Sequence, residues 1–491
     1  MKIFLKRALA LILTFALVLL SGCGKDNMKL TASSNQGGDL LYSFSEDNSE
    51  LQRYEQSLLE ELLSDTNSQL NEGALTSHSS STTSLQSDFS DDINSSLGGV
   101  TTSLPSASSV VTSNPNHTVT RDEKMSFRAL WISYYEFPFW GSNEQKAKTK
   151  TLEMMTLAKK QGYTAVFCHV RANADAFYPS KYFPFAMQLT GTPGGDPGYD
   201  PLKIMIWAAK RCGLEIHAWI NPYRVSNVTT NPNELAEGHI ARTWLTDGSN
   251  RAIISGNGIY FNPSSTDVQK LILYGIREIL ANYNVDGIHF DDYFYPEKVS
   301  DDFDSMRYNA YVAATENPLC LADWRRANVN ALVSAVYRLC HSKKVVFGIS
   351  PAANISYDNS HDNYNLLYAD IALWMREEGY VDYILPQLYF GYNHPVKKSR
   401  YDYLLGIWAS LPKHKNLKFY IGLGAYRMNE NVDDKEEWHN ETDLMARQVL
   451  DAWKLGAEGF AVFSYSASMS ENQHNSLQIK NLFDAVNSLS E

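Results

Sequence analysis

Eight short runs rich in β-branched and aromatic residues recur along the C-terminal part of the chain, separated by longer segments with helical periodicity. We expect strands at residues 128–135, 163–170, 215–222, 287–295, 345–351, 381–389, 418–425 and 459–466. Residues 145–161, 201–212 and 267–282 have typical helix boundaries. Eight strands that alternate with helices in one domain indicate an α/β fold, a closed (β/α)8 TIM barrel. A doubly wound open sheet fits less well, because no glycine-rich phosphate-binding turn follows the first strand.

Residues 1–22 predict a signal peptide for export. Three basic residues precede the apolar run 8–20, which is too short to span a bilayer and has the length of a signal-peptide core. The run ends in Leu20-Ser21-Gly22-Cys23, a sequence typical of bacterial lipoproteins, whose cysteine is acylated and becomes the new N-terminus. We therefore expect an extracytoplasmic protein that a lipid on Cys23 anchors to the cell membrane. The alternative is an ordinary cleaved signal, which keeps the export and loses the anchor.

Residues 23–124 are predicted to be a flexible linker. Ser, Thr, Asn and Asp dominate this segment, and residues 24–120 hold 13 Asp and Glu against 3 Lys and Arg. Such a composition offers too little apolar surface to order a chain. As a flexible coil, the linker would place the folded region on the order of 50–60 Å from the bilayer. Leucines at helical spacing in residues 51–63 predict one transient amphipathic helix within it.

Residues 125–491 form the predicted barrel domain, and their charge argues against one class of partner. Residues 121–491 hold 42 Asp and Glu against 37 Lys and Arg without a basic cluster, which is not typical of a nucleic-acid binder. The cysteines other than Cys23 have neither the spacing of a metal site nor that of a disulfide framework. We expect a monomer without a metal or cofactor, whose partners are a polysaccharide and the membrane.

The loops after the strands should form the active site, because the chemistry of TIM barrels sits at the C-terminal ends of the strands. The intervals are longest after the second, third and fourth strands, so residues 171–200, 223–262 and 293–323 are expected to wall the pocket. These segments are rich in aromatic residues, Asn, Gly and Pro. Aromatic faces with amides between them suit a sugar chain, whose rings have apolar faces and polar rims. The alternative is that the aromatic residues pack the loops onto the barrel.

Four strand ends carry the side chains that we expect to contact a substrate. Because side chains alternate along a strand, His289, Asp291 and Tyr293 share one face at the end of the fourth strand. Asp292 then lies at the rim. The alternative for these adjacent acids is a helix cap or a loop anchor. The residues predicted to bind substrate are Arg171, Asp175, His217, Trp219, Asn221, Tyr223, Arg224, His289, Tyr293, Gln387 and Tyr389.

Six segments occur in the order of a known family: Arg128-Ala129-Leu130-Trp131, Val170-Arg171-Ala172-Asn173-Ala174-Asp175-Ala176-Phe177-Tyr178, Gly198-Tyr199-Asp200-Pro201-Leu202, His217-Ala218-Trp219-Ile220-Asn221-Pro222-Tyr223-Arg224, Asp286-Gly287-Ile288-His289-Phe290-Asp291-Asp292-Tyr293 and Pro386-Gln387-Leu388-Tyr389. From residue 127 to about 483, the chain thereby resembles the glycosyl hydrolase-like 10 domain family of secreted and lipid-anchored bacterial proteins. The resemblance implies a glycoside hydrolase-like barrel that acts on envelope polysaccharide, including peptide-stripped peptidoglycan strands. The fourth strand is also similar to the α-amylase-type Gly-Phe-Arg-x-Asp strand, which implies that Asp291 is the nucleophile and His289 its inward neighbour.

Hydrolysis of a glycosidic bond needs two carboxyl groups, a proton donor and a nucleophile or base. Asp291 fits the second role, but no Asp or Glu closes the fifth to eighth strands. The candidates for the proton donor are, in order, Asp292, Glu136 and then Asp175 or Asp200. We therefore predict an envelope-anchored glycoside hydrolase with Asp291, Asp292 and Glu136 as catalytic residues.

Two other functions stay open. His169, His217 and His289 lie on the inward faces of three consecutive strands and, with Asp291, could hold a metal ion for hydrolysis or deacetylation. The usual His-x-His of the first strand is absent, and such histidines more often hydrogen-bond within a polar barrel layer. The other alternative is a lipoprotein that binds glycan without cleaving it, because no proton donor stands out.

Overall fold

The computed structural model describes the side chains of residues 50–64, 125–137, 141–355 and 362–489, and the backbone of residues 31–34, 40–43 and 49–75. The predicted signal peptide (1–22) and Cys23 lie outside the described residues, as does much of the predicted linker. No helix within the described ranges is long and apolar enough to cross a membrane.

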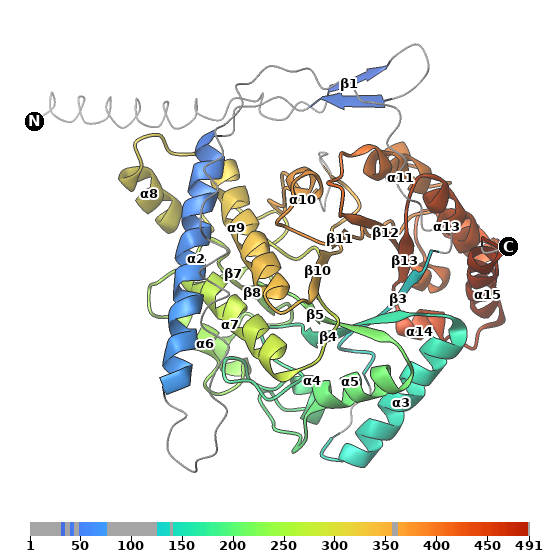
Figure 1. Cartoon of the computed structure of the whole chain (residues 1–491), viewed down its shortest axis with the longest axis horizontal. Coiled ribbons are helices and arrows are strands. Elements are labelled where there is room, and N and C mark those ends of the chain that lie inside the picture. The colour runs from blue at the N-terminus through green and yellow to red at the C-terminus, as the bar shows by residue number, and fades with distance from the viewer. Residues whose placement is uncertain are drawn as a thin grey trace, which may run out of the picture.

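Eight parallel strands close into a barrel that helices surround (Figure 1). In chain order the barrel strands are β3 (Phe127–Ile132), β4 (Ala165–Arg171), β5 (Glu215–Ile220), β9 (Gly287–Phe290), β10 (Val346–Ile349), β11 (Tyr383–Ile384), β12 (Lys418–Leu423) and β13 (Gly459–Val462). Each strand pairs with the next, and β13 pairs with β3. The predicted (β/α)8 barrel is therefore confirmed, and each of the eight predicted runs overlaps one of its strands.

All of the strands except β4 end earlier than the sequence pattern suggests, and the residues beyond them form the mouth of the barrel. The sixth predicted strand is shortened most, to the two residues of β11. Pro386 has no backbone N–H and interrupts the ladder. Pairing resumes only at Gln387, as isolated bridges to Ala352 and Gly422. The proline thus leaves Gln387 and the residues after it at the mouth.

The helices of the outer ring begin at well-defined caps. The longer ones are α3 (Glu144–Gln161), α5 (Pro201–Arg211), α7 (Thr266–Asn282), α9 (Leu321–His341), α11 (Tyr401–Ser410), α13 (Leu444–Lys454) and α15 (Gln473–Ser488), and a shorter one is α10 (Ile371–Arg376). The side chains of Asn143, Asp200 and Ser265 each accept a hydrogen bond from a backbone N–H three residues later. These caps begin α3, α5 and α7, which confirms the three predicted helices.

Shorter elements occupy the loops. After β5 the chain forms a small sheet in the order β6 (Arg224–Ser226), β8 (Gly258–Phe261) and β7 (Ala252–Ser255). The remaining elements are β1 (Thr31–Ser34), β2 (Leu40–Ser43), α4 (Met187–Thr190), η1 (Pro232–Glu234), α6 (Ile240–Trp244), α8 (Ser305–Ala314), η2 (Lys397–Ser399), η3 (Ala425–Asn429), α12 (Lys435–Asn440) and α14 (Tyr465–Ser468).

Aromatic side chains fill the interior of the barrel. The ring of Phe127 stacks on Tyr420 at 4.4 Å between centroids, and Phe167 stacks on His289 at 4.1 Å. The inner cluster is separate from the main core between strands and helices, and its buried members are Ala129, Trp131, Ala165, Phe167, Trp219, Tyr383, Leu385 and Ala461. The barrel is therefore packed rather than a pore, and a ligand site has to lie at its mouth.

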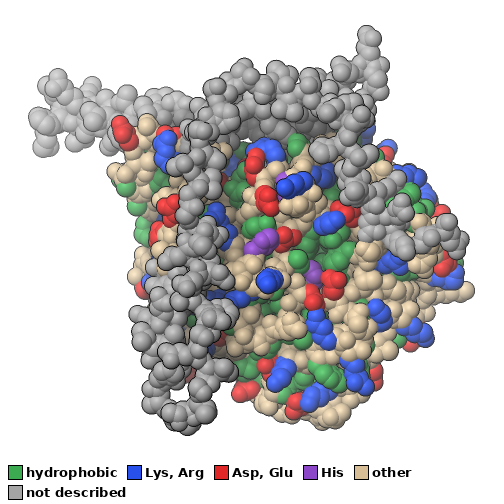
Figure 2. All heavy atoms as spheres, viewed as in Figure 1, with side chains coloured by type: hydrophobic (Ala, Val, Ile, Leu, Met, Phe, Trp, Pro, Cys, Tyr) green, Lys and Arg blue, Asp and Glu red, His purple; other side chains and the backbone are tan. Residues whose placement is uncertain are grey.

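Charges of both signs are mixed over the surface. On the face that Figure 2 shows, Lys and Arg side chains are interspersed with Asp and Glu. Some of these charges pair at the barrel, as Lys210 does with Asp286 and Lys418 with Glu458, both at 2.5 Å. This mixing agrees with the near balance of charge in the barrel domain.

One helix from the predicted linker packs on the barrel. Helix α2 (Ser49–Leu75) lies along α9 and α7 (Figure 1), and its Leu58, Leu59 and Leu62 are buried. The predicted helix in residues 51–63 is confirmed, whereas the expectation of a flexible linker is wrong for this segment. A single leucine stripe is too weak to hold an isolated helix, but the barrel helices supply the apolar partner that the stripe needs.

Candidate active site

A cavity of about 810 Å³ opens at the C-terminal ends of the strands, a size typical of ligand pockets. All eight strand ends contribute to its lining, which consists of Trp131, Ser133, Tyr134, Tyr135, His169, Trp219, Arg224, Asn227, Asp291, Asp292, Tyr293, Ser350, Ala352, Ala353, Asn354, Gln387, Tyr389, Phe390, Val396, Ser399, Tyr426, Arg427 and Phe463. The predicted wall segments 223–262 and 293–323 take part, but 171–200 does not. The loops after β10, β11 and β12 take its place.

Asp291 and Asp292 follow directly after β9 and face the cavity. Asp291 is 3% exposed, and its Oδ2 accepts a hydrogen bond of 3.0 Å from Nε1 of Trp219. Its Oδ1 accepts a longer bond of 3.3 Å from the backbone N–H of Tyr293. Burial, and then the charge of Asp292, raise the pKa of Asp291 to about 7, against the opposing charge of Arg224. Near neutral pH, the buried carboxyl therefore holds a proton for part of the time.

A stack of polar and aromatic groups supports Trp219. The ring of His169 lies 3.7 Å from that of Trp219, nearly parallel to it, and Nε2 of His169 pairs with Oδ1 of Asn221 at 2.6 Å. Burial lowers the pKa of His169 well below its usual value, so the imidazole is neutral. Asn221 and Tyr223 are fully buried and do not line the cavity. The structure therefore makes Asn221 a support of the wall and not a direct ligand.

Arg224 lies beside the carboxylates. Its Nε donates to the backbone oxygen of Ala172 at 2.9 Å, and its guanidinium lies 4.7 Å from the ring centroid of Tyr293. Both Arg224 and Tyr293 line the cavity, as predicted for substrate-binding residues. A guanidinium anchored through Nε keeps its other N–H groups for Asp291 or for a ligand.

Residues after β11, β12 and β13 form the wall of the cavity that faces Trp219 and Arg224. Gln387 donates from Nε2 to the backbone oxygen of Ser350 at 2.8 Å. Tyr389 stacks with Phe463 at 5.9 Å between centroids and meets the edge of Tyr426 at 5.7 Å. Both predicted residues of this wall, Gln387 and Tyr389, thus line the cavity.

Several lining residues were missed by the sequence reasoning. Trp131, Ser350, Tyr426, Arg427 and Phe463 lie at or just beyond strand ends, where the sequence pattern already placed the mouth. The sequence prediction named substrate-binding side chains at the ends of the second, third, fourth and sixth strands, whereas these residues lie at the ends of the first, fifth, seventh and eighth. Applying the strand-end rule to all polar and aromatic residues would have found them.

His217 and His289 lie beneath the cavity floor. The hydroxyl of Tyr383 bridges Nδ1 of His217 at 3.0 Å and Nδ1 of His289 at 2.9 Å. Nε2 of His289 accepts from Nε1 of Trp131 at 3.2 Å and lies 3.0 Å from Oγ of Ser350. Neither histidine lines the cavity, so both lie away from the surface that a substrate in it would contact. They sit in lower layers of the barrel, and His289 instead positions two groups that do line it.

Arg171 points away from the cavity, contrary to the prediction. The register between β4 and β5 shifts between His169 and Arg171, which breaks the simple alternation of side chains. The guanidinium lies 4.4 Å from the ring centroid of Phe183 and against α7. A Cβ at Gly275 would come within 2.8 Å of its Nη1, which explains a glycine in the middle of that helix.

The other candidate proton donors lie outside the cavity lining. Glu136 accepts hydrogen bonds from the backbone N–H groups of Ser133 at 2.9 Å and Ser466 at 2.7 Å, and from the hydroxyl of Ser464. It therefore joins the first strand end to the eighth. Burial raises the pKa of Asp175 to about 6, but this residue also lies outside the lining. Asp200 caps α5. Among the described lining residues, the carboxylates are Asp291 and Asp292.

The histidines considered for a metal site do not converge. His169 pairs with Asn221, whereas His217 and His289 share Tyr383. Over the described parts of the chain, no group of three or more His, Cys, Asp or Glu side chains is arranged to hold a metal ion.

Comparison with known proteins finds relatives of this chain by sequence. Residues 126–440 match the model of a family described as glycosyl hydrolase-like 10. The chain is 36% identical over 345 residues to glycosyl hydrolase YngK of Bacillus subtilis (strain 168), covering 65% of each protein. It is 33% identical over 355 residues to glycosyl hydrolase DigH of Escherichia coli (strain K12), covering 65% of this chain and 77% of that one. The glycoside hydrolase domain of PgaB (BpsB) from Bordetella bronchiseptica superimposes with a TM-score of 0.45 at 12% identity, over 72% of this chain and 98% of that one. From its sequence match, the chain belongs to the glycosyl hydrolase-like 10 family.

Proposed function

We propose that this protein hydrolyses O-glycosidic bonds of a cell-envelope polysaccharide, with peptide-free peptidoglycan strands as the first candidate substrate. The observation that carries the proposal is the pair Asp291 and Asp292 at a cavity with aromatic walls. Membership of the glycosyl hydrolase-like 10 family supports a glycosidase-like function.

The environments of the two carboxyl groups suggest different roles for them. Asp291 is buried and has a pKa of about 7, which suits a group that gives up a proton near neutral pH. Asp292 is only partly buried. We assign proton donation to Asp291 and stabilisation of the positive, oxocarbenium-like transition state to Asp292. This assignment reverses the nucleophilic role that the α-amylase resemblance implied for Asp291.

The walls supply what a sugar chain needs for binding. Trp219, Tyr293 and Tyr389 offer aromatic faces for the apolar faces of sugar rings. Arg224 and Gln387 offer hydrogen-bond donors for hydroxyl groups. Trp219, Arg224 and Tyr293 lie at the ends of β5 and β9, and Gln387 and Tyr389 follow β11, so a bound chain would contact both groups beside the carboxylates.

The proposed substrate also depends on where the protein works. A lipid on Cys23 remains a prediction, and it would hold the enzyme at the membrane. Because α2 begins at Ser49, residues 24–48 then connect the lipid to the barrel. Strands β1 and β2 pair within this segment, so its reach is no longer than the roughly 25–30 Å that a coil of this length spans, about half that of the full linker. We propose that the enzyme acts on glycan close to the membrane.

The test is incubation of residues 24–491 with peptide-free peptidoglycan strands and a panel of other polysaccharides, with new reducing ends as the readout. Asp291→Asn removes the proposed proton donor, and Asp402→Asn, an exposed aspartate on α11, is the matched control. Release by the wild type and the control, but not by Asp291→Asn, is the expected result. Binding of one glycan without release from any would refute the enzyme and indicate a glycan-binding lipoprotein.

A further inference from the structure

Helix α2 has a specific seat on the barrel. Leu58, Leu59 and Leu62 bury their side chains against α7 and α9. Glu61 on the rim of this contact pairs with Lys270 of α7 at 3.4 Å. An apolar stripe with charged flanks is typical of a helix that docks in a groove.

Buried polar contacts fix the register of the docked helix. Glu55 is 8% exposed, and its Oε1 accepts from Nδ2 of Asn330 at 2.7 Å. Its Oε2 accepts from the hydroxyl of Tyr380 at 3.3 Å. Asn330 is itself held by Nε1 of Trp374 at 2.7 Å. These hydrogen bonds can form only when α2 has one rotation about its own axis and one position along α9.

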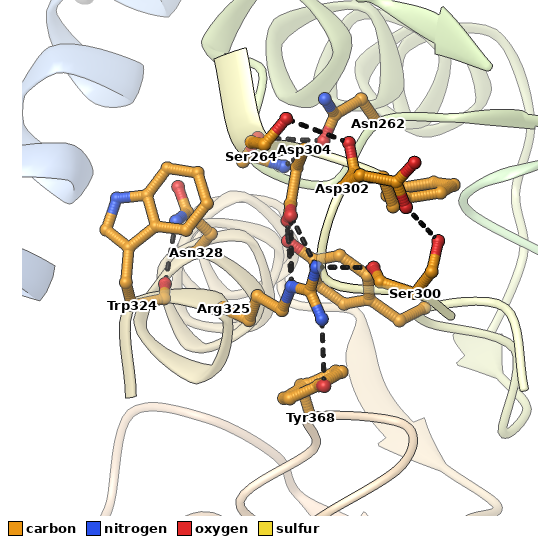
Figure 3. A network of polar contacts seen from close by, with 12 residues as sticks. Asn262, Ser264, Ser300, Asp302, Asp304, Trp324, Arg325, Asn328 and Tyr368 are labelled. Atoms are coloured by element: carbon orange, nitrogen blue, oxygen red, sulfur yellow. Dashed lines mark hydrogen bonds and ion pairs between the residues drawn. The ribbon is translucent and has the colours of Figure 1, made fainter. Parts of the chain in front are cut away.

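A second contact joins α2 to the part of α9 that contacts the loop 291–304, which begins with Asp291 and Asp292. The hydroxyl of Tyr54 accepts from Nε1 of Trp324 at 2.8 Å. Trp324 precedes Arg325 on α9, as Figure 3 shows, and Arg325 points toward Asp304. The guanidinium and the Asp304 carboxylate are both fully buried and lie 2.5 Å apart.

The Arg325–Asp304 pair holds the loop that begins with Asp291. Arg325 also donates to the backbone oxygen of Ser300 at 3.0 Å and to the hydroxyl of Tyr368 at 2.8 Å (Figure 3). Asp304 in turn accepts from the hydroxyl of Tyr295 at 2.9 Å. Residues 295–304 are thereby fastened to α9, a few residues beyond the carboxylate pair.

We infer that the α7–α9 face is a docking surface for the chain's own helix α2, and that docking holds α9 and the loop 291–304 in their active arrangement. The occupant is the segment seated there in the structure, and residues 76–124 link it covalently to the barrel. Because α2 is covalently linked to the barrel, its effective concentration at this surface is high. The helix can therefore leave the surface and bind to it again. The inference rests on the proposed function only where it concerns activity.

Glu55 makes this docking depend on pH. The ionisable groups that face it from the packed elements are Asp370, which caps α10, and Tyr380. Burial raises the pKa of Glu55 to about 8, with a smaller contribution from Asp370, against the hydrogen bond from Asn330. An undocked glutamate titrates near its ordinary value of 4.5. The docked state therefore keeps a proton that the free helix loses, and docking weakens as pH rises, by roughly 70-fold between pH 5.5 and 7.5.

Hydrogen exchange of residues 24–491, the chain without the predicted signal peptide and lipidated cysteine, tests the inference without any substrate. Amides of α2, α9 and the loop 291–304 are followed at pH 5.5 and 7.5, corrected for intrinsic exchange. Leu59→Asp is designed to release α2, and Ser57→Asp, an exposed position on the same helix, is the matched control. We expect Leu59→Asp to speed exchange in α9 and in the loop by about tenfold, and the control to leave both unchanged.

Two further variants separate docking from its consequences. Glu55→Gln keeps hydrogen-bonding capacity and should abolish the pH dependence of α2 protection. Tyr54→Phe removes the hydrogen bond to Trp324 and should speed amide exchange in the loop 291–304 by about twofold or more, while α2 stays protected.

Unprotected α2 amides at pH 5.5 would overturn the docking. Unchanged loop exchange in Leu59→Asp would overturn the coupling, and unchanged pH dependence in Glu55→Gln would overturn the role of Glu55. None of these results depends on whether the protein cleaves glycan.

Discussion

Replacing Trp219 by Phe tests the role of Asp291 through one hydrogen bond. Nε1 of Trp219 donates to the buried Asp291 carboxylate at 3.0 Å, and this bond favours the charged form. A hydrogen bond to a charged group contributes about 1.5–3 kcal/mol, and one pKa unit corresponds to about 1.4 kcal/mol. Losing the bond should raise the pKa of Asp291 by about 1–2 units, from about 7 to roughly 8–9.

The assay is the pH dependence of kcat/KM for glycan cleavage. If Asp291 donates the proton, activity falls as this carboxyl ionises, so the basic limb of the profile moves upward with its pKa. Loss of the stack on His169 also lowers the height of the profile, but it does not set the pH of the limb. Trp207→Phe, an exposed position on α5, is the control and should leave the limb in place. A limb that stays where it is in the wild type, or moves to lower pH, would refute the assignment.

Three other variants have distinct expected outcomes. Asp291→Asn should lower reducing-end release by about 10²–10⁴-fold with a melting temperature close to wild type, since it removes only a proton donor; retained activity would exclude the role. Glu136→Gln should keep kcat but lower the free energy of unfolding in urea by about 1–3 kcal/mol, because the hydrogen bonds to Ser133, Ser464 and Ser466 are weakened. A loss of kcat without a loss of stability would make Glu136 a catalytic candidate again. Arg325→Met should cost about 3–5 kcal/mol by the same measurement, because it leaves the Asp304 carboxylate buried without its partner; an unchanged unfolding midpoint would show that the pair is not needed.

The outer ring and the strand count could be read from the sequence because they depend on local pattern. Helix caps such as Asn143 and Ser265 act within three residues, and strand runs are recognised by their own composition. The position of Asp291 and Asp292 followed from the same reasoning, since they come directly after an apolar strand. Their partner Trp219 was predicted for the site, but its hydrogen bond to Asp291 depends on how β5 and β9 pair.

The tertiary structure decided which strand-end side chains reach the cavity. Arg171 was expected inside, but one register shift between neighbouring strands turned it toward α7. His217 and His289 share the inward face as predicted, yet both lie below the floor of the cavity. Their depth in the barrel depends on how all eight strands are staggered. The sequence alone thus determined the barrel, its helices and the carboxylates at its mouth, because each depends on near neighbours along the chain. Only the tertiary structure decided the roles of the other candidates and the seat of α2, because burial and pairing between distant segments set them.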